Sequence, residues 1–251
     1  MSLYEKFAGV YHRGPYPAFA LRMAEVLPVV LERFDCHPTR LLDIACGEGS
    51  FSAAMAHRGL HVTGLDRSKQ MLAFGRQRSQ TERLDIDWVE GNLRHLPFSS
   101  SFDLVTCWFD SLNYLLECEH LRQAFTGVQR ALKPGGVFIF DMNTIYGLAV
   151  GWTRQAIYVQ QDYPDLLELH RTQFDYDRLL ARVTVTAFER QGDTWMRFDE
   201  EHLEKGYPVE EILSELENSG LQALGSFGNF LEMSEVKPES GRAYFVAQKG
   251  D

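Results

Sequence analysis

A glycine-containing turn flanked by carboxylates is the part of this chain best suited to hold a ligand. Apolar residues before it predict a buried strand, and Gly47 and Gly49 let the backbone bend and approach a ligand closely. Ser50 is predicted to cap a helix over residues 51–57. A strand, tight turn and helix in this order are typical of a site for a nucleotide-like ligand at the edge of a parallel sheet. The run reads Leu41-Leu42-Asp43-Ile44-Ala45-Cys46-Gly47-Glu48-Gly49-Ser50.

The charge of this turn indicates which nucleotide-like ligand it suits. The third glycine of the dinucleotide pattern G-x-G-x-x-G is missing, and Asp43 and Glu48 would repel a pyrophosphate. S-adenosyl-L-methionine instead carries a sulfonium and an ammonium beside one carboxylate, so an acidic turn suits it. The alternative is a plain turn without a ligand, which the motifs that follow disfavour.

A second acidic strand end follows along the chain. Residues 61–66 read as a strand that ends in Asp66, roughly twenty residues beyond the turn, where a carboxylate can accept hydrogen bonds from both ribose hydroxyls. The alternative is that Asp66 or Ser68 only caps a helix over residues 69–78. The spacing from the glycine turn favours ribose binding.

Several ordered motifs over residues 40–142 resemble those of the class I S-adenosylmethionine-dependent methyltransferases. LLDIACGEGS is similar to the first motif of that family, GLDRS to the acidic end of its second strand, and VEGNLRHLPF to its third strand and loop. SFDLVTCWFDSLNYL and ALKPGGVFIFDMN resemble the fourth motif and the fifth strand. Small-molecule enzymes such as glycine N-methyltransferase and the sugar N-dimethyltransferases of antibiotic pathways are the nearest in pattern. The resemblance implies an α/β fold with a Rossmann-like, doubly wound, seven-stranded sheet whose last strand is antiparallel.

The resemblance also implies which residues bind the methyl donor. Asn92 and Leu93 would lie beside the adenine, although many relatives carry Asp at position 92, and Phe109 would contact the methionine part. Met71 would be an apolar wall or, alternatively, a core residue of its helix. The aromatic N-terminal run would fold over the donor or, alternatively, only pack on the core. The expected donor-binding residues are Asp43, Ala45, Gly47, Gly49, Asp66, Arg67, Met71, Asn92, Leu93, Phe109, Tyr11 and Tyr16.

Methyl transfer needs an aligned nucleophile and a dry site, and it needs a base only if the nucleophile arrives protonated. Tyr114, His202 and Asp141 are the catalytic candidates, with Glu201 and Asp110 as further possible bases. In the sugar N-dimethyltransferases a His takes the place of Tyr114. Asp141 ends the fifth strand and is expected to hold a substrate amine, whereas His202 faces either the substrate or the outer side of its strand.

The pattern of predicted elements changes after the fifth strand. Up to about residue 142 strands alternate with helices, which predicts a parallel sheet. Alternating β-rich segments then predict antiparallel strands over 166–174, 180–190 and 194–203, and a helix over 208–218 precedes strands at 221–230 and 242–248. We therefore expect a methyltransferase core at 1–150 and 207–251, and an inserted antiparallel layer, or substrate lid, at 151–206.

Composition limits the class of partner. The chain has 251 residues and a formal net charge of −10, which disfavours a nucleic-acid target. It contains no apolar run long enough for a bilayer, and its four cysteines lack the spacing of disulfides or metal sites, so we expect a cytoplasmic protein. The predicted function is methyl transfer from S-adenosylmethionine to a nitrogen or oxygen of a small molecule. A catalytically silent donor-binding module and a nicotinamide oxidoreductase are the alternatives; the acceptor and the oligomeric state are not predicted.

Overall fold

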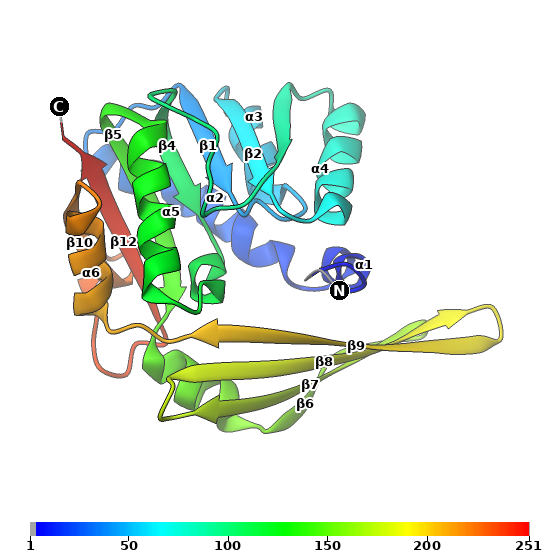
Figure 1. The fold of residues 1–251 in the computed structure, drawn as a ribbon. Helices are drawn as coiled ribbons and strands as arrows, with labels where there is room; N and C mark the ends of the chain where they lie inside the picture. The colour runs from blue at the N-terminus through cyan, green and yellow to red at the C-terminus, as the bar shows by residue number, and fades with distance from the viewer. Residues whose placement is uncertain (1–3, 251) are drawn as a thin grey trace.

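Two β-sheets, one beneath the other, form the frame of this protein (Figure 1). The structure is a computed structural model that describes residues 4–250. The larger sheet has eight strands in the order β11-β10-β12-β5-β4-β1-β2-β3, and the smaller has four in the order β6-β7-β8-β9. The smaller sheet lies below the ends to which the parallel strands of the larger sheet point.

Five parallel strands form the half of the larger sheet that positions the site. Their apolar runs are largely buried because helices cover both faces of the sheet. The loops that follow β1 and β4 lead to opposite faces of the sheet, so they diverge and leave a crevice at the carboxyl ends of these two strands. The strands are β1 (Arg40–Ile44), β2 (His61–Asp66), β3 (Ile86–Glu90), β4 (Phe102–Cys107) and β5 (Leu132–Asn143).

The remaining strands of the larger sheet pair antiparallel with their neighbours, and the last strand is antiparallel to β5, as the resemblance implied. β12 (Arg242–Lys249) pairs with β5 on one side and with β10 (Leu221–Asn229) on the other. The short edge strand β11 (Ser234–Glu235) adds an eighth strand to the expected seven. Residues 133–136, whose Pro and Gly residues are typical of a turn, belong to β5, where a register shift against β4 accommodates them.

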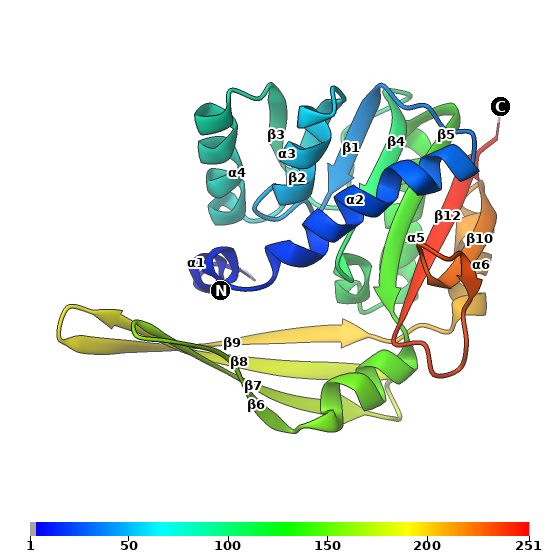
Figure 2. The same cartoon turned by 180° about the vertical axis from the view of Figure 1, so that it is seen from behind.

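Helices cover both faces of the larger sheet (Figure 2). α2 (Pro17–Arg33) and α3 (Ser50–His57) pack on one face with one apolar cluster, whereas α5 (Cys118–Ala131) and α6 (Val209–Asn218) pack on the other. α4 (Lys69–Glu82) lies beside β3. α5 is strongly amphipathic, and its helically spaced apolar residues are fully buried because they face the sheet.

The smaller sheet begins after β5, as expected, but has one strand more than the sequence predicted. The strands are β6 (Ile157–Tyr163), β7 (Leu166–Asp175), β8 (Leu180–Gln191) and β9 (Thr194–Lys205), all antiparallel. β6 was missed because its apolar side chains at 157 and 159 are exposed rather than buried. Two helical turns, Gly147–Gly151 and Trp152–Arg154, connect it to β5.

The short helix α1 (Phe7–Arg13) lies between the two layers (Figures 1 and 2). Phe7 and Val10 are buried in an apolar cluster with residues of the smaller sheet, including Leu166 and Val185. The N-terminal segment therefore holds the smaller sheet beside the carboxyl ends of the parallel strands. Among residues 4–250, no helix combines the length and hydropathy needed to cross a bilayer.

Candidate active site

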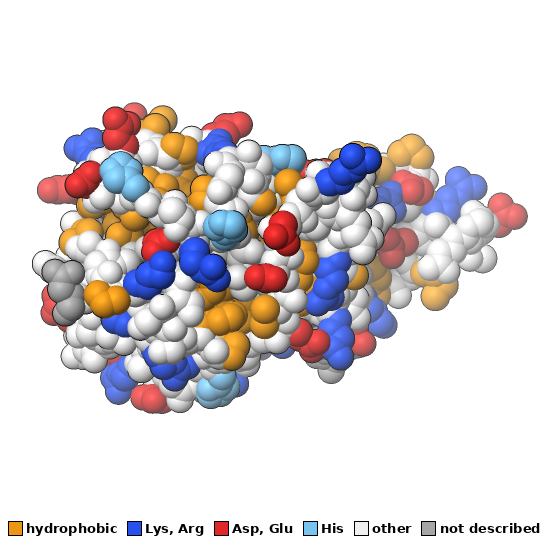
Figure 3. Space-filling model, turned by 90° about the horizontal axis from the view of Figure 1, so that it is seen from above, with side chains coloured by type: hydrophobic (Ala, Val, Ile, Leu, Met, Phe, Trp, Pro, Cys, Tyr) orange, Lys and Arg blue, Asp and Glu red, His pale blue; other side chains and the backbone are white. Residues whose placement is uncertain are grey.

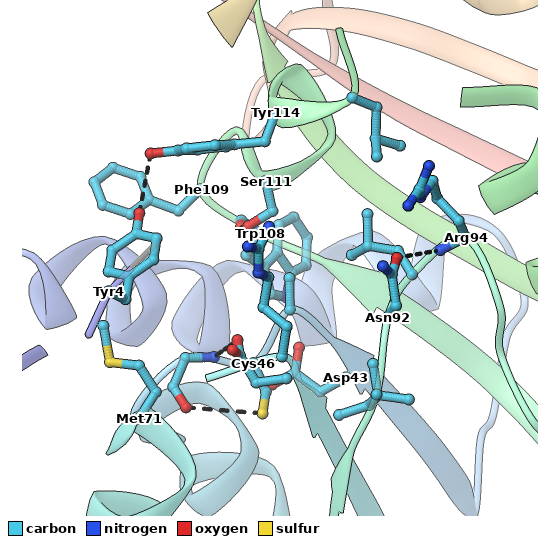
Figure 4. A pocket seen from close by; sticks show the side chains of 18 of the residues that line it. Tyr4, Asp43, Cys46, Met71, Asn92, Arg94, Trp108, Phe109, Ser111 and Tyr114 are labelled. Atoms are coloured by element: carbon cyan, nitrogen blue, oxygen red, sulfur yellow. Dashed lines mark hydrogen bonds between the residues drawn. The ribbon is translucent and has the colours of Figure 1, made fainter. Parts of the chain in front are cut away.

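A cavity of about 460 Å³ opens at the carboxyl ends of β1, β2 and β4 (Figure 4). Its volume lies in the range typical of small-molecule sites. Eleven of the residues expected to bind the donor or act in catalysis line it, drawn from α1, β1, β2, α4 and the segments that follow the first four strands. They are Tyr11, Asp43, Ala45, Gly47, Asp66, Arg67, Met71, Asn92, Leu93, Phe109 and Tyr114.

The turn between β1 and α3 is shaped by its two glycines. Gly47 and Gly49 have positive φ values of 57° and 81°, which side chains rarely adopt. Gly47 lines the cavity, and its amide donates to Asp66 Oδ2 over 2.8 Å. Gly49 lies outside the cavity wall, where a side chain would collide with the Trp88 ring. Gly49 therefore supports the turn without reaching a ligand.

Glu48 and Ser50 have other roles than the sequence predicted. Glu48 is buried, and its carboxylate pairs with Arg78 at 2.5 Å and with His12 Nδ1 at 3.0 Å. The charge of Glu48 is thus compensated inside the protein and does not face a ligand. Ser50 is the first residue of α3, not its cap: the capping position is Gly49, and the Ser50 hydroxyl donates to Glu48.

Asp66 ends β2 with its carboxyl group at the cavity wall. Its oxygens accept from the amides of Gly47 and Ser68, both over 2.8 Å. Ser68 caps α4 by accepting from the Met71 amide, so Asp66 is not needed for that role. Burial raises the pKa of Asp66, although its amide hydrogen bonds oppose the shift. Each carboxylate oxygen keeps a further acceptor site, which suits a vicinal diol.

Asp43 adds a second carboxyl group to the same wall. It is buried and accepts from Ser52 Oγ over 2.6 Å and from Thr106 Oγ1 over 3.1 Å. Burial raises its pKa to about 7, because neutral hydroxyls only partly replace the lost water. Neither Asp43 nor Asp66 has an ion-pair partner in the part of the chain that the structure describes. This wall therefore fits a ligand that carries both positive charge and a diol.

The rest of the cavity combines apolar walls with a polar opening. Met71 is almost fully buried, whereas Arg67 and Asn92 lie at exposed positions. Several lining residues were not singled out from the sequence, because those at the end of β4 look like core and those near α5 look like ordinary surface. They include Cys46, Arg94, Trp108, Ser111, Leu115, Leu116, Glu117 and His120.

Tyr114 joins the cavity to the smaller sheet. Its hydroxyl lies 3.0 Å from that of Tyr4 and 3.0 Å from Nδ1 of His202 (the first contact is drawn in Figure 4). His202 stands on the buried face of β9, where its Nε2 lies 3.4 Å from Glu200 Oε1. Burial raises the pKa of Tyr114 well above its ordinary value and lowers that of His202 to about 4. Both side chains are therefore neutral near pH 7.

Asp141 lies behind the cavity wall, which corrects its expected place at the substrate. It is completely buried, and it accepts from the amides of Phe109 over 2.7 Å and Asp110 over 3.1 Å. Its carboxylate also pairs with Arg242, which in turn contacts Asp110 at 2.7 Å. With its oxygens engaged in this way, Asp141 holds the turn after β4 and does not present a free carboxylate to a substrate amine.

Tyr16 and His202 likewise do not line the cavity. The Tyr16 hydroxyl donates to Glu168 and lies 3.2 Å from His170 Nε2, both on the smaller sheet. The ring of Tyr16 stacks on that of Tyr11, with the centroids 4.7 Å apart. Tyr16 thus supports a lining residue, whereas His202 reaches the cavity only through Tyr114.

Comparisons with known proteins show what the chain is similar to. A methyltransferase-domain family model matches residues 41–136. The putative methyltransferase YqeM of Bacillus subtilis (strain 168) is 31% identical, over 98% of this chain and 97% of its own length. The crystal structure of a S-adenosylmethionine-dependent methyltransferase from Clostridium acetobutylicum ATCC 824 superposes with a TM-score of 0.85 and 26% identity, covering 100% of both chains. The sugar N-methyltransferase KedS8 from Streptoalloteichus sp ATCC 53650 has a TM-score of 0.77 and 22% identity, covering 100% of this chain and 95% of its own.

Proposed function

Because this chain belongs to the class I S-adenosylmethionine-dependent methyltransferases, we propose that it methylates a nitrogen or oxygen atom of a small molecule. S-adenosylmethionine is its methyl donor. The observation that carries the proposal is the Tyr114 hydroxyl at the cavity wall, hydrogen-bonded at 3.0 Å to a buried neutral histidine.

Residues around the glycine turn would hold the donor. Asp66 would accept from the ribose hydroxyls, and Asp43 would lie near the positively charged part. Met71 and Leu93 would enclose the adenine, with Asn92 at its polar edge. When bound, the donor supplies a methyl group on a positively charged sulfur. Ala45, Gly47, Arg67, Phe109 and Tyr11 complete the proposed donor site.

Tyr114 and His202 would accept the proton of the acceptor. The Tyr114 hydroxyl can take a hydrogen bond from the nucleophile while donating its own proton to His202 Nδ1. Because its pKa is about 4, His202 is unprotonated near neutrality and its Nδ1 can accept from Tyr114; it would hold the transferred proton only transiently before releasing it to solvent. Tyr114 is thus the proposed catalytic residue, and His202 acts through it.

The smaller sheet would set which acceptor is used. It carries His202 to Tyr114, and α1 packs on its inner face beside the cavity. We infer that residues 151–206 form the acceptor-specific layer on a donor-binding core at 1–150 and 207–251. This arrangement supports a compact acceptor, because the layer and α1 cover the approach to Tyr114.

The surface charge also favours a small molecule over a nucleic acid. The chain carries a net charge of −10. On the face seen in Figure 3, Lys and Arg side chains are interspersed with Asp and Glu side chains. A nucleic-acid-binding protein gathers its positive charge on one face to neutralise phosphates.

A turnover assay tests the proposal. The protein is incubated with S-adenosylmethionine and a panel of small amines and hydroxyl compounds, and release of S-adenosylhomocysteine is measured. Amino sugars belong in the panel because the fold of KedS8, named a sugar N-methyltransferase, covers the whole chain. We expect turnover of at least one compound, and a fall in kcat of about 100-fold or more in Tyr114→Phe, as for loss of acid–base catalysis.

His202→Gln separates proton transfer from positioning. Glutamine can still accept a hydrogen bond from Tyr114 but cannot take up a proton. We expect kcat to fall nearly as far as in Tyr114→Phe, with little change in the KM for the donor. Full activity in both variants would contradict the proton path, and no release of S-adenosylhomocysteine with any panel member would contradict the small-molecule proposal.

A further inference from the structure

Glu200 is a buried carboxylate beside the proposed proton path through Tyr114 and His202. It stands two residues before His202 on β9, so both side chains point to the same face of the smaller sheet. Both are buried. Oε1 of Glu200 lies 3.4 Å from Nε2 of His202, whereas the other ring nitrogen, Nδ1, contacts Tyr114. The imidazole therefore has a hydroxyl at one nitrogen and a carboxylate at the other.

The contact with Tyr114 does not by itself decide which nitrogen of His202 carries the proton. A tyrosine hydroxyl both donates and accepts, and the Tyr114 hydroxyl has a second hydroxyl, that of Tyr4, 3.0 Å away (Figure 4). Nδ1 can therefore accept from Tyr114 or donate to it. An ionised carboxylate only accepts, so Glu200 favours the tautomer with the proton on Nε2. In that tautomer Nδ1 is the acceptor that the proton path requires.

Main-chain amides of the N-terminal segment hold the Glu200 carboxylate in place. Oε1 accepts from the amide of Tyr4 over 2.6 Å, and Oε2 accepts from the amide of Phe7, the first residue of α1, over 3.4 Å. Burial raises the pKa of Glu200, whereas these amides favour its ionised form and oppose the shift. Each carboxylate oxygen has two acceptor sites, so Oε1 can serve the Tyr4 amide and His202 together.

The interaction between Glu200 and His202 should be weak while His202 is neutral and strong once it is protonated. Nε2 is buried and makes no hydrogen bond to any described residue, although Oε1 is only 3.4 Å away. A proton that arrives on Nδ1 makes both ring nitrogens donors and gives the ring a positive charge. The carboxylate then faces an imidazolium in a buried site, where opposite charges attract more strongly than in water. Such a difference between two protonation states is what lowers a reaction barrier.

We propose that Glu200 is a positioning residue for methyl transfer, which keeps the proton of His202 on Nε2 and stabilises the ring when Nδ1 takes up a second proton. The proposal rests on the proposed proton path. The proton lost by the acceptor replaces the one that Tyr114 passes to Nδ1, and His202 then releases a proton to solvent. Glu200 itself neither gains nor loses a proton.

Nitrogen NMR of the histidine rings tests the tautomer at pH 7 without any turnover. In protein labelled with ¹⁵N-histidine, the ring-nitrogen shifts show which nitrogen of a neutral histidine is protonated. The chain has eight histidines, and the signals of His202 are those lost in His202→Gln. If that variant does not fold, the signals are assigned by elimination from glutamine variants of the other seven. We expect the proton on Nε2 in the unmodified protein, and an about tenfold larger share of the Nδ1-protonated tautomer in Glu200→Gln.

Glu200→Gln and Glu201→Gln form a matched pair for the kinetic test. Both remove one carboxylate from β9, but Glu201 is exposed and pairs with Arg182 at 3.3 Å. Glutamine at position 200 still accepts from the Tyr4 amide, so the contact with the N-terminal segment is kept. With an acceptor that the protein methylates, we expect kcat to fall by about 10- to 100-fold in Glu200→Gln and to stay unchanged in Glu201→Gln. The KM for S-adenosylmethionine should stay the same in both.

A purely structural role for Glu200 would change different quantities. Tyr4 and Tyr11 line the cavity, so loosening of the N-terminal segment would raise the KM for S-adenosylmethionine and leave the tautomer of His202 unchanged. That result would overturn the proposal, as would a proton on Nδ1 in the unmodified protein. An unchanged kcat in Glu200→Gln beside a reduced kcat in Tyr114→Phe would overturn the role of Glu200 alone. Full activity in Tyr114→Phe would overturn the proton path itself.

Discussion

Two pairs of buried carboxylates at the same edge of the larger sheet have opposite surroundings. Asp43 and Asp66, in β1 and at the end of β2, face the cavity and accept only from hydroxyls and amides among the described residues. Asp110 and Asp141, after β4 and in β5, enclose the guanidinium of Arg242. The first pair has no cation of the protein beside it, whereas the charge of the second pair is partly compensated by Arg242.

At this edge of the sheet, a buried carboxylate is therefore available to a ligand where no arginine or lysine of the described residues pairs with it. Arg242 also lies over the rings of Phe19 and Phe109, 4.7 and 5.6 Å from their centroids. The carboxylates of Asp110 and Asp141 therefore have a structural role in the cavity wall. Asp141 accepts from the amide of Phe109 and holds this residue at the cavity, although its φ of 61° is unfavourable for a residue with a side chain. We propose that the pair at β1 and β2 faces the positively charged methyl donor.

Removing the cation from the compensated pair should have the largest effect. Arg242→Met would leave two buried carboxylates without a cation beside them, which we expect to lower the free energy of unfolding by about 3–5 kcal/mol. Urea denaturation followed by circular dichroism measures this change. Arg182→Met is the control, because Arg182 forms an exposed ion pair with Glu201 that should contribute at most about 1 kcal/mol. A similar small loss in both variants would contradict the role assigned to Arg242.

Neutralising one carboxylate of each pair should sharpen the contrast. Asp66→Asn is expected to weaken binding of S-adenosylhomocysteine by about 10- to 100-fold, since its charge-assisted hydrogen bonds to the ribose are lost. The same change at Asp141 removes a carboxylate that does not line the cavity, so its effect on affinity should be much smaller. Titration calorimetry of both variants decides this. Equal losses of affinity would mean that the two pairs do not differ in function.

A pH dependence should be the smallest of the three effects. The pKa of Asp43 is about 7 in the free protein, and a bound cation favours its ionised form. Ligand binding therefore lowers this pKa, so affinity for S-adenosylmethionine should increase by up to about tenfold from pH 6 to pH 8. Asp43→Asn should remove this part of the pH dependence, and the amino group of the ligand accounts for any remainder. An unchanged profile in that variant would show that Asp43 does not sense the ligand's charge.

Much of the donor site was predictable because it follows from local sequence. Asp43, Gly47 and Asp66 line the cavity as expected, since the end of each parallel strand reaches the same edge of the sheet. Which carboxylates pair with an arginine of the protein was not predictable from local sequence. From local sequence Glu48 belongs to the acidic turn, but Arg78, 30 residues further along, pairs with it in the fold.

The candidate catalytic residues show the same limit. Tyr114 lines the cavity directly after β4, whereas His202 comes to it from β9, 88 residues away. The Trp108 indole was read within an apolar strand, and its unpaired N–H is visible only once its neighbours are placed.

The amino-acid sequence by itself determined the alternation of strands and helices up to β5, the glycine turn and the acidic strand ends, because these depend on periodicity and on the backbone preferences of nearby residues. Only the tertiary structure decided which carboxylates keep their charge exposed to a ligand. That outcome depends on Arg242 and Arg78, which reach their partners from distant parts of the chain, and electrostatic energy depends on distance in space rather than separation in sequence.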